Sequence, residues 1–231
     1  MNKAIEKARR TVYYNLRLVK TNLRGGHMSA EIIQLVCSMN LKNINTQIAL
    51  QCSPLLTGIK ISNLLITNCE NEYLVKQLFE NTSLSVEMIY KSDKRITFLI
   101  FQEDKLIDYL NGIEETALFN ILGYNAMKLH EIFAEFSKRF TRYMEKREDF
   151  PHEMGLFLEY PVEDVIGFIE NQGKKFLYTG YWKVYGNLQK ALETFDRYNS
   201  AKENIIQLLA QGVSIEGILT IYHLKNNQLV I

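Results

Sequence analysis

The sequence predicts a segregated α+β fold, in which several helices cover a small, mainly antiparallel sheet and the C-terminal half is rich in helix. Two runs rich in β-branched and aromatic residues, 84–90 and 95–101, flank the polar segment Lys91–Lys94 and indicate a β-hairpin. Apolar residues at three- and four-residue steps then dominate the chain after residue 125 and indicate long amphipathic helices. Only 3 prolines and 12 glycines occur, which leaves little room for disorder.

In the first half, the periodicity predicts alternating helices and strands. Ser29 can cap a helix that runs to about Met39. Residues 43–50 are ambiguous. Pro54 biases Ser53 to an extended backbone and Gly58 permits a turn, so the segment Cys52–Lys60 is expected to be a turn. Beyond it, a buried strand is expected at 61–67, a helix at 70–80, the hairpin strands at 84–90 and 95–101, and a helix at 103–110.

The second half reads mainly as helix. Helices are predicted at 114–122 and 125–148, with Gly123 between them. Pro151 and Pro161 each suit the first turn of a helix, so a helix–elbow–helix is expected before Gly173. The run 176–185 alternates as a single strand, a long helix follows at 188–211, and Ser214 caps a last helix to about Tyr222.

Composition and cysteine content limit the classes of protein. Hydrophobic residues make up 47% of the 231 residues and charged residues 23%, which is ordinary for a globular protein. The net charge of +1 gives no general reason to expect a nucleic-acid partner. Cys37, Cys52 and Cys69 form no Cys-x-x-Cys pair, so we expect reduced thiols in a cytoplasmic protein, without a disulfide framework or a zinc ribbon. No apolar run approaches the roughly 20 residues of a membrane span.

The first 24 residues differ from the rest in charge. Seven basic residues stand against Glu6 alone, for a charge of +6, and apolar residues recur at helical spacing from Ile5 to Leu23. The pattern predicts a basic amphipathic helix. It either lies on an anionic membrane, polyanion or protein partner, or docks on the domain with its basic side in solvent, which we favour. Residues 1–27 are either native or an extension ahead of a start at Met28, and residues 28–231 are expected to form one α+β domain.

Three segments carry a family resemblance. The runs Cys52–Lys60, Phe150–Pro161 and Gly180–Gly186 are similar to signature segments of an uncharacterised bacterial family, domain of unknown function number 3793. The Phe-Pro-His-Glu run within the second segment is the most specific of the three. The resemblance spans roughly Met28 to Tyr222. It implies a bacterial, cytoplasmic protein from anaerobic species and brings no known activity.

The leading functional hypothesis is a small-ligand or cofactor site where these segments converge, with the cofactor not identified. His152 and Glu153 could act as a general acid/base pair or form part of a metal site, although not one of the His-Glu-x-x-His type, or they could satisfy polar groups at a helix start. Cys52 could be a nucleophile, a soft metal or haem ligand, or a redox thiol activated by Lys60, or a small buried thiol. The rival hypothesis is an enzyme in which Cys52 is the nucleophile or redox thiol and His152 the acid/base.

The aromatic run completes the expected site. Tyr178, Tyr181, Trp182 and Tyr185 could stack a flat ligand while Lys183 holds its phosphate or carboxylate, or the same rings could pack within the sheet. A third hypothesis is a protein-interaction module that uses the basic residues 1–24. The turn at 211–215 resembles that of a DNA-binding helix-turn-helix, but residues 215–222 contain no Arg or Lys, so nucleic-acid binding is not expected.

Overall fold

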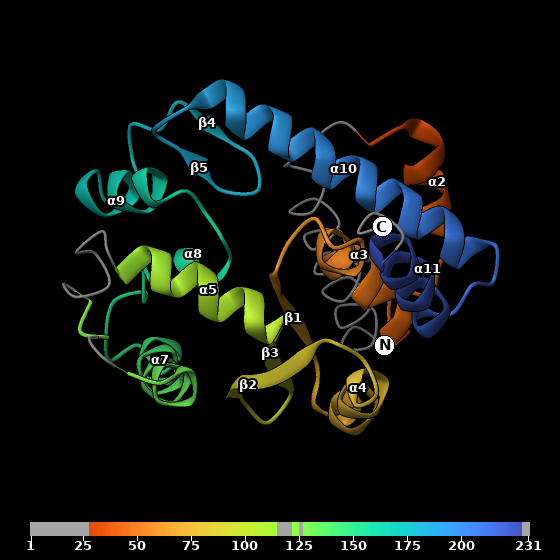
Figure 1. The fold of residues 1–231 in the computed structure, drawn as a ribbon, viewed down its shortest axis with the longest axis horizontal. Coiled ribbons are helices and arrows are strands. Elements are labelled where there is room, and N and C mark those ends of the chain that lie inside the picture. The colour runs from red at the N-terminus through yellow and green to blue at the C-terminus, as the bar shows by residue number, and fades with distance from the viewer. Residues whose placement is uncertain (1–27, 115–121, 125–126, 228–231) are drawn as a thin grey trace, which may run out of the picture.

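The computed structural model describes residues 28–114, 122–124 and 127–227, and it confirms the α+β prediction. A three-stranded antiparallel sheet lies near the middle of the molecule and helices surround it, as Figure 1 shows. The second half of the described chain is almost entirely helical. The predicted helix at 1–23 and all but the first and last residues of the one at 114–122 lie outside the described residues. No helix within the described ranges is long and apolar enough to cross a membrane.

The sheet has its third strand at the centre. The strands β1 (Ser62–Asn68) and β2 (Ser85–Lys91) both pair antiparallel with β3 (Arg95–Phe101), which confirms the predicted hairpin. Ser62 and Ser85 both lie opposite Phe101. The beginnings of β1 and β2 therefore meet the end of β3 at one end of the sheet, next to Lys60.

Alternation along β3 supplies two separate hydrophobic cores. Ile96, Phe98 and Ile100 join one core, whereas Leu99 and Phe101 join the other. The first core also takes residues from α3 (Ile44–Leu56), α4 (Glu72–Phe79) after the short helix η1 (Cys69–Asn71), and α11 (Ile215–Asn227). The second takes residues from α5 (Glu103–Glu114), α7 (Leu129–Met144), α8 (Met154–Phe157) and α9 (Val162–Glu170).

The 23-residue helix α10 (Leu188–Ala210) connects the remaining parts. Ile206 in its second half packs with α2 (Ala30–Ser38), and Phe195 and Tyr198 in its first half pack against β4 (Tyr178–Thr179) and β5 (Lys183–Val184). At a rise of about 1.5 Å per residue the helix is about 35 Å long. It therefore reaches from α2 to the two-stranded ribbon, as Figure 1 shows.

The prediction of one strand over 176–185 is wrong. The chain instead forms the ribbon of β4 and β5, in which Tyr178 pairs with Val184 and Thr179 with Lys183. Gly180 lies at the reversal, and a Cβ atom there would overlap the ring of Phe195. The turn could not be predicted from the alternating pattern. The sequence does not show that Gly180 packs closely against the ring of Phe195, so the pattern alone predicts an ordinary strand residue at that position.

The prediction of a turn throughout Cys52–Lys60 is wrong in its first half. Helix α3 continues through Pro54 to Leu56, and only the residues after it turn, with Gly58 at a φ of 71°. Ser53 is helical because its hydroxyl donates to the Ala49 carbonyl within the helix. The Pro54 carbonyl then accepts hydrogen bonds from the backbone N–H groups of residues 59 and 60, at 2.9 and 3.0 Å. This closing turn holds Lys60 directly ahead of β1.

Candidate functional site

The three segments singled out in the sequence converge around Lys60. Lys60 follows the turn after α3, Tyr160 lies in the elbow between α8 and α9, and Tyr181 lies in the turn of the ribbon. Helix α10 closes the group with inward-facing side chains. We call the set the lysine–tyrosine cluster and define it as Lys60, Glu159, Tyr160, Tyr181, Tyr198 and Lys202.

Lys60 is a buried cation that packs against rings. Its side chain is 5% exposed, and its Nζ lies 5.8 Å from the ring centroids of both Tyr160 and Tyr198. Within the described part of the chain this ammonium donates no hydrogen bond. Burial lowers the pKa of Lys60 from 10.5 to about 8, against the opposing attraction of Glu159 and Cys52. The group is therefore mostly protonated at neutral pH, in surroundings that disfavour its charge.

Glu159 connects the elbow to the sheet. It has a φ of 55°, and its Oε2 accepts hydrogen bonds from the backbone N–H groups of Ile61, at 2.6 Å, and Ser62, at 3.4 Å. Burial raises the pKa of this carboxyl group, while Lys60 and the two N–H groups lower it. The carboxylate thus fixes the beginning of β1 and supplies a negative charge near Lys60 without forming a close ion pair with it.

The tyrosines form a connected group. The Tyr160 hydroxyl donates to the Tyr181 carbonyl at 3.2 Å, and the Tyr181 hydroxyl donates to Asn199 Oδ1 at 3.0 Å. The rings of Tyr181 and Tyr198 meet edge to face, with centroids 5.1 Å apart. Lys202 Nζ lies 5.1 Å from the Tyr181 centroid, and burial lowers its pKa to about 8. Two buried lysines therefore flank one pair of rings.

Trp182 forms a wall of the cluster. Its ring lies 5.2 Å from that of Tyr160 and 4.5 Å from that of Phe195. Its Nε1 donates to Asp164 Oδ2 at 2.6 Å, and Asp164 Oδ1 accepts from the N–H groups of Tyr185 and Gly186 at 2.7 and 2.8 Å. The polar atom of Trp182 is thus already bonded, and only its ring surface is available to a ligand.

The other predicted ligand residues lie farther along the ribbon. Tyr178 is partly exposed, and its ring lies 6.2 Å from that of Phe195. Lys183 Nζ donates to the Gly173 carbonyl at 2.6 Å, so its charge already has an acceptor. The hydroxyl of Tyr185 is buried and has no hydrogen-bond partner among the described residues. Ligand contacts by these three residues stay a prediction.

Cys52 lies in α3 and faces the core rather than the surface. Its side chain is completely buried, and its Sγ lies 3.8 Å from the Leu64 carbonyl oxygen. Burial raises the pKa of the thiol to about 12, and the nearby charge of Lys60 lowers it only in part. At neutral pH the group is a thiol, which is not the nucleophilic form. A catalytic role for Cys52 stays a prediction that these surroundings do not favour.

His152 lies among aromatic rings at the other side of the elbow. Its ring is half-buried, 6.0 Å from that of Phe150 and 5.5 Å from that of Phe168. Within the described ranges no hydrogen bond or ring contact joins it to Cys52 or to the lysine–tyrosine cluster. The convergence of segments therefore runs through Lys60 and Tyr160, and the acid/base role of His152 stays a prediction.

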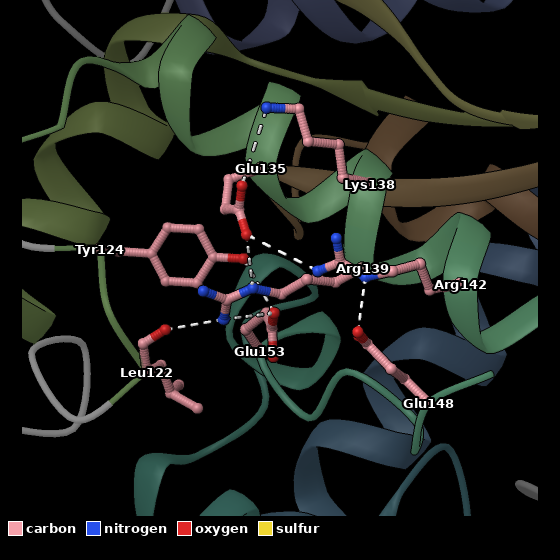
Figure 2. Close-up of polar contacts among 8 residues, drawn as sticks. All are labelled: Leu122, Tyr124, Glu135, Lys138, Arg139, Arg142, Glu148 and Glu153. Atoms are coloured by element: carbon pink, nitrogen blue, oxygen red, sulfur yellow. Dashed lines mark hydrogen bonds and ion pairs between the residues drawn. The ribbon is translucent and has the colours of Figure 1, made fainter.

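Glu153 belongs to a separate polar network between α7 and α8, which Figure 2 shows. It is 2% exposed and accepts hydrogen bonds from the Tyr124 hydroxyl at 2.8 Å and from Arg139 Nη1 at 3.3 Å. Arg139 also donates to Glu135 at 3.0 Å and to the Leu122 carbonyl at 2.7 Å. We call this set the Glu153 network. These bonds link α7 to the beginning of α8, and a catalytic role for Glu153 stays a prediction.

Comparison with known proteins identifies a family. The model of a family described as "Protein of unknown function (DUF3793)" matches residues 48–219, which is most of the chain. The chain belongs to this family. The matched range of this DUF3793 protein contains the whole lysine–tyrosine cluster and the Glu153 network. No curated protein and no solved structure matched the chain.

Sequence reasoning missed four of the six residues of the lysine–tyrosine cluster in this DUF3793 protein. Tyr198 and Lys202 are four residues apart on the inward side of α10, so a lysine at a position of apolar periodicity was the available signal. Glu159 and Tyr160 directly precede Pro161, inside a segment that was already singled out. No group of three His, Cys, Asp or Glu residues suited to a metal ion occurs within the described ranges.

Proposed function

We propose that this DUF3793 protein binds a small anionic ligand at the lysine–tyrosine cluster, with Lys60 as the anchoring cation. The observation that carries the proposal is the ammonium of Lys60, which is buried against two rings and donates no hydrogen bond among the described residues. Burial of a charge without hydrogen-bonded compensation is unfavourable. A carboxylate or phosphate oxygen would supply both the missing acceptor and the opposite charge.

The surroundings of Lys60 suit an anion with an apolar body. Trp182 and Tyr160 present ring surfaces beside the ammonium, and Lys202 adds a second buried cation near Tyr181. Because Lys60 is almost fully buried, the proposal requires Tyr160 or Tyr198 to move when the ligand enters. Tyr178, Lys183 and Tyr185 on the ribbon would then contact the outer part of the ligand.

The geometry does not favour the thiol-enzyme hypothesis, whereas the free cysteines support a cytoplasmic location. A thiol enzyme built on Cys52 and His152 gains nothing from this geometry, since burial keeps the thiol protonated. A cytoplasmic location remains part of the proposal, and the free thiols of Cys37, Cys52 and Cys69 support it, because thiols stay reduced in that compartment.

A thermal-shift experiment tests the binding. Purified protein is melted with inorganic phosphate, acetate or succinate, at an ionic strength matched with chloride. Ligand at about 100 times its Kd adds about 2.7 kcal/mol of stability, which corresponds to about 5–10 °C for a chain of this size. We expect at least one of these anions to raise the Tm of the native protein.

Matched variants locate the site. Lys60→Met keeps an unbranched side chain that is one atom shorter and removes its charge, whereas Lys138→Met removes a charge from a side chain that is 67% exposed on α7. The anion-dependent rise in Tm should disappear in Lys60→Met and persist in Lys138→Met. The proposal fails if none of the three anions raises the Tm, or if the rise is equal in both variants.

A further inference from the structure

A second feature, apart from the lysine–tyrosine cluster, is an open groove of about 1210 Å³ between α4, α11 and the beginning of α3. Small-molecule pockets usually enclose about 300–1,000 Å³ and bury most of their ligand. A larger, open groove bordered by helices suits an amphipathic helix instead, which lays its apolar side along the floor.

The lining of the groove combines four apolar residues with seven uncharged polar residues and three charged ones. Ile44, Leu78 and Leu219 supply apolar side chains, and Leu74 extends them with a side chain that is 48% exposed. The charged residues of the lining are Glu80, Glu216 and Lys105, all of them exposed, so acidic groups outnumber basic ones. The C-terminal end of α4 also borders the groove, and the dipole of the helix adds partial negative charge there.

We infer that this groove is the docking site of the protein's own N-terminal segment, residues 1–24. The segment has the complementary composition: a charge of +6 and apolar residues at helical spacing from Ile5 to Leu23. Its apolar stripe would cover Leu74 and Leu78, and its basic side would lie beside Glu80 and Glu216. Lys105 opposes the attraction at one point of the rim.

The length of the segment permits this contact. The described chain begins at Met28, which is buried in a cluster with Leu50 of α3, and the beginning of α3 borders the groove. As a helix, 24 residues extend about 36 Å, whereas a folded chain of this size has a radius of gyration of about 17 Å. A segment of this length is long enough to extend from Met28 along the beginning of α3 to the groove.

Site-directed photo-crosslinking of the full chain tests the inference. p-Benzoylphenylalanine replaces Leu74 at the rim of the groove or, as a control, the similarly exposed Leu192 on α10. After irradiation, peptide mapping should find crosslinks from position 74 to residues 1–24 and none of these from position 192. An equimolar mixture of ¹⁴N- and ¹⁵N-labelled protein separates contacts within a chain from contacts between copies.

Crosslinked peptides of a single isotope that join position 74 to residues 1–24 would support the inference. Mixed-isotope peptides, crosslinks only to other parts of the chain, or no crosslink would overturn it. Charge variants supply a second readout. Glu80→Lys combined with Glu216→Lys should reduce the yield several-fold, whereas Glu193→Lys on the exposed side of α10 should not change it. Equal yields in the two charge variants would contradict the proposed complementarity.

Discussion

Lys60 and Glu153 are both buried charged residues from segments that the sequence singled out, yet their surroundings differ. Glu153 is 2% exposed and accepts hydrogen bonds from a tyrosine hydroxyl and an arginine. Lys60 is 5% exposed, lies against two rings and donates no hydrogen bond within the described ranges. Burial alone therefore does not separate the hydrogen-bonded charge of Glu153 from the charge of Lys60, at which we propose that a ligand binds. The difference lies in how far the protein itself satisfies the charge.

The largest expected effect comes from breaking the Glu153 network. Glu153→Ala removes the carboxylate to which the Tyr124 hydroxyl and Arg139 donate. Loss of one member of a buried pair typically costs about 3 kcal/mol, and urea denaturation should show a decrease of that size in the free energy of unfolding. Glu135→Ala, at a carboxylate that is 28% exposed, should cost no more than about 1 kcal/mol. Equal decreases in the free energy of unfolding of the two variants would show that the buried Glu153 is no more important for stability than the more exposed Glu135.

The next effect uses the lowered pKa of Lys60. In the folded protein this group loses its proton near pH 8, whereas in the unfolded chain it does so near 10.5. Between these values the unfolded chain binds more protons, so the contribution of Lys60 to stability rises with pH. The free energy of unfolding of the native protein, minus that of Lys60→Met, should increase by about 2 kcal/mol from pH 7.5 to 10.

Subtracting the variant matters because other groups titrate in the same range. Lys202 acts in the same direction as Lys60, whereas the raised pKa of Cys52 acts in the opposite direction above pH 9. Both contributions are common to the two proteins and cancel in the difference. A difference that stays constant or falls between pH 7.5 and 10 would show that Lys60 carries an ordinary, well-compensated charge.

A smaller effect is expected at Asp164, which resembles Glu153 in being a buried carboxylate with several donors. Asp164→Asn keeps the shape of the side chain but weakens its bonds to Trp182 Nε1 and to the N–H groups of Tyr185 and Gly186. We expect a loss of about 1.5 kcal/mol in urea denaturation, with a change in Trp182 fluorescence. If Asp164→Asn were as stable as the native protein, the charge of Asp164 would not contribute to the stability of the fold in the way we expect for Glu153.

The smallest energetic effect is expected at Cys52, beside the lysine–tyrosine cluster. Cys52→Ala removes one buried sulfur atom and should cost about 1 kcal/mol. In the native protein at pH 8, iodoacetamide should label the exposed Cys37 and leave Cys52 unmodified until the chain unfolds. Mass spectrometry measures the labelling rate of each thiol. Similar rates for Cys37 and Cys52 would support the thiol-enzyme hypothesis.

The sequence pattern correctly predicted those helices and strands that depend mainly on residues close to one another in the chain. The hairpin at 84–101 was recognisable because two β-rich runs flank a polar turn, and α10 because its apolar spacing continues for six turns. Pro54 and Gly180 misled the prediction, since the hydroxyl of Ser53 supports the helix in one case and the ring of Phe195 requires the turn in the other. Neither interaction is visible in a window of sequence.

The site shows the same limit. Lys60 and Trp182 were expected because they lie in conspicuous segments, but the contact between Glu159 and Ile61 joins residues 98 positions apart. Tyr198 and Lys202 enter the cluster only because α10 packs against the ribbon and the elbow. Sequence reasoning found segments that converge and could not tell which of their side chains face the centre.

The pKa of Lys60 tests the central claim most directly. Its ¹³Cε resonance, assigned by comparing the ¹³C-labelled native protein with Lys60→Met, is followed by NMR from pH 6 to 12 without added ligand. We predict a midpoint near 8, and an upward shift when phosphate or a carboxylate binds, because a bound anion stabilises the charged form. A midpoint near 10.5 that does not move with any of the anions tested would contradict the claim that Lys60 is a buried cation without a hydrogen-bond acceptor.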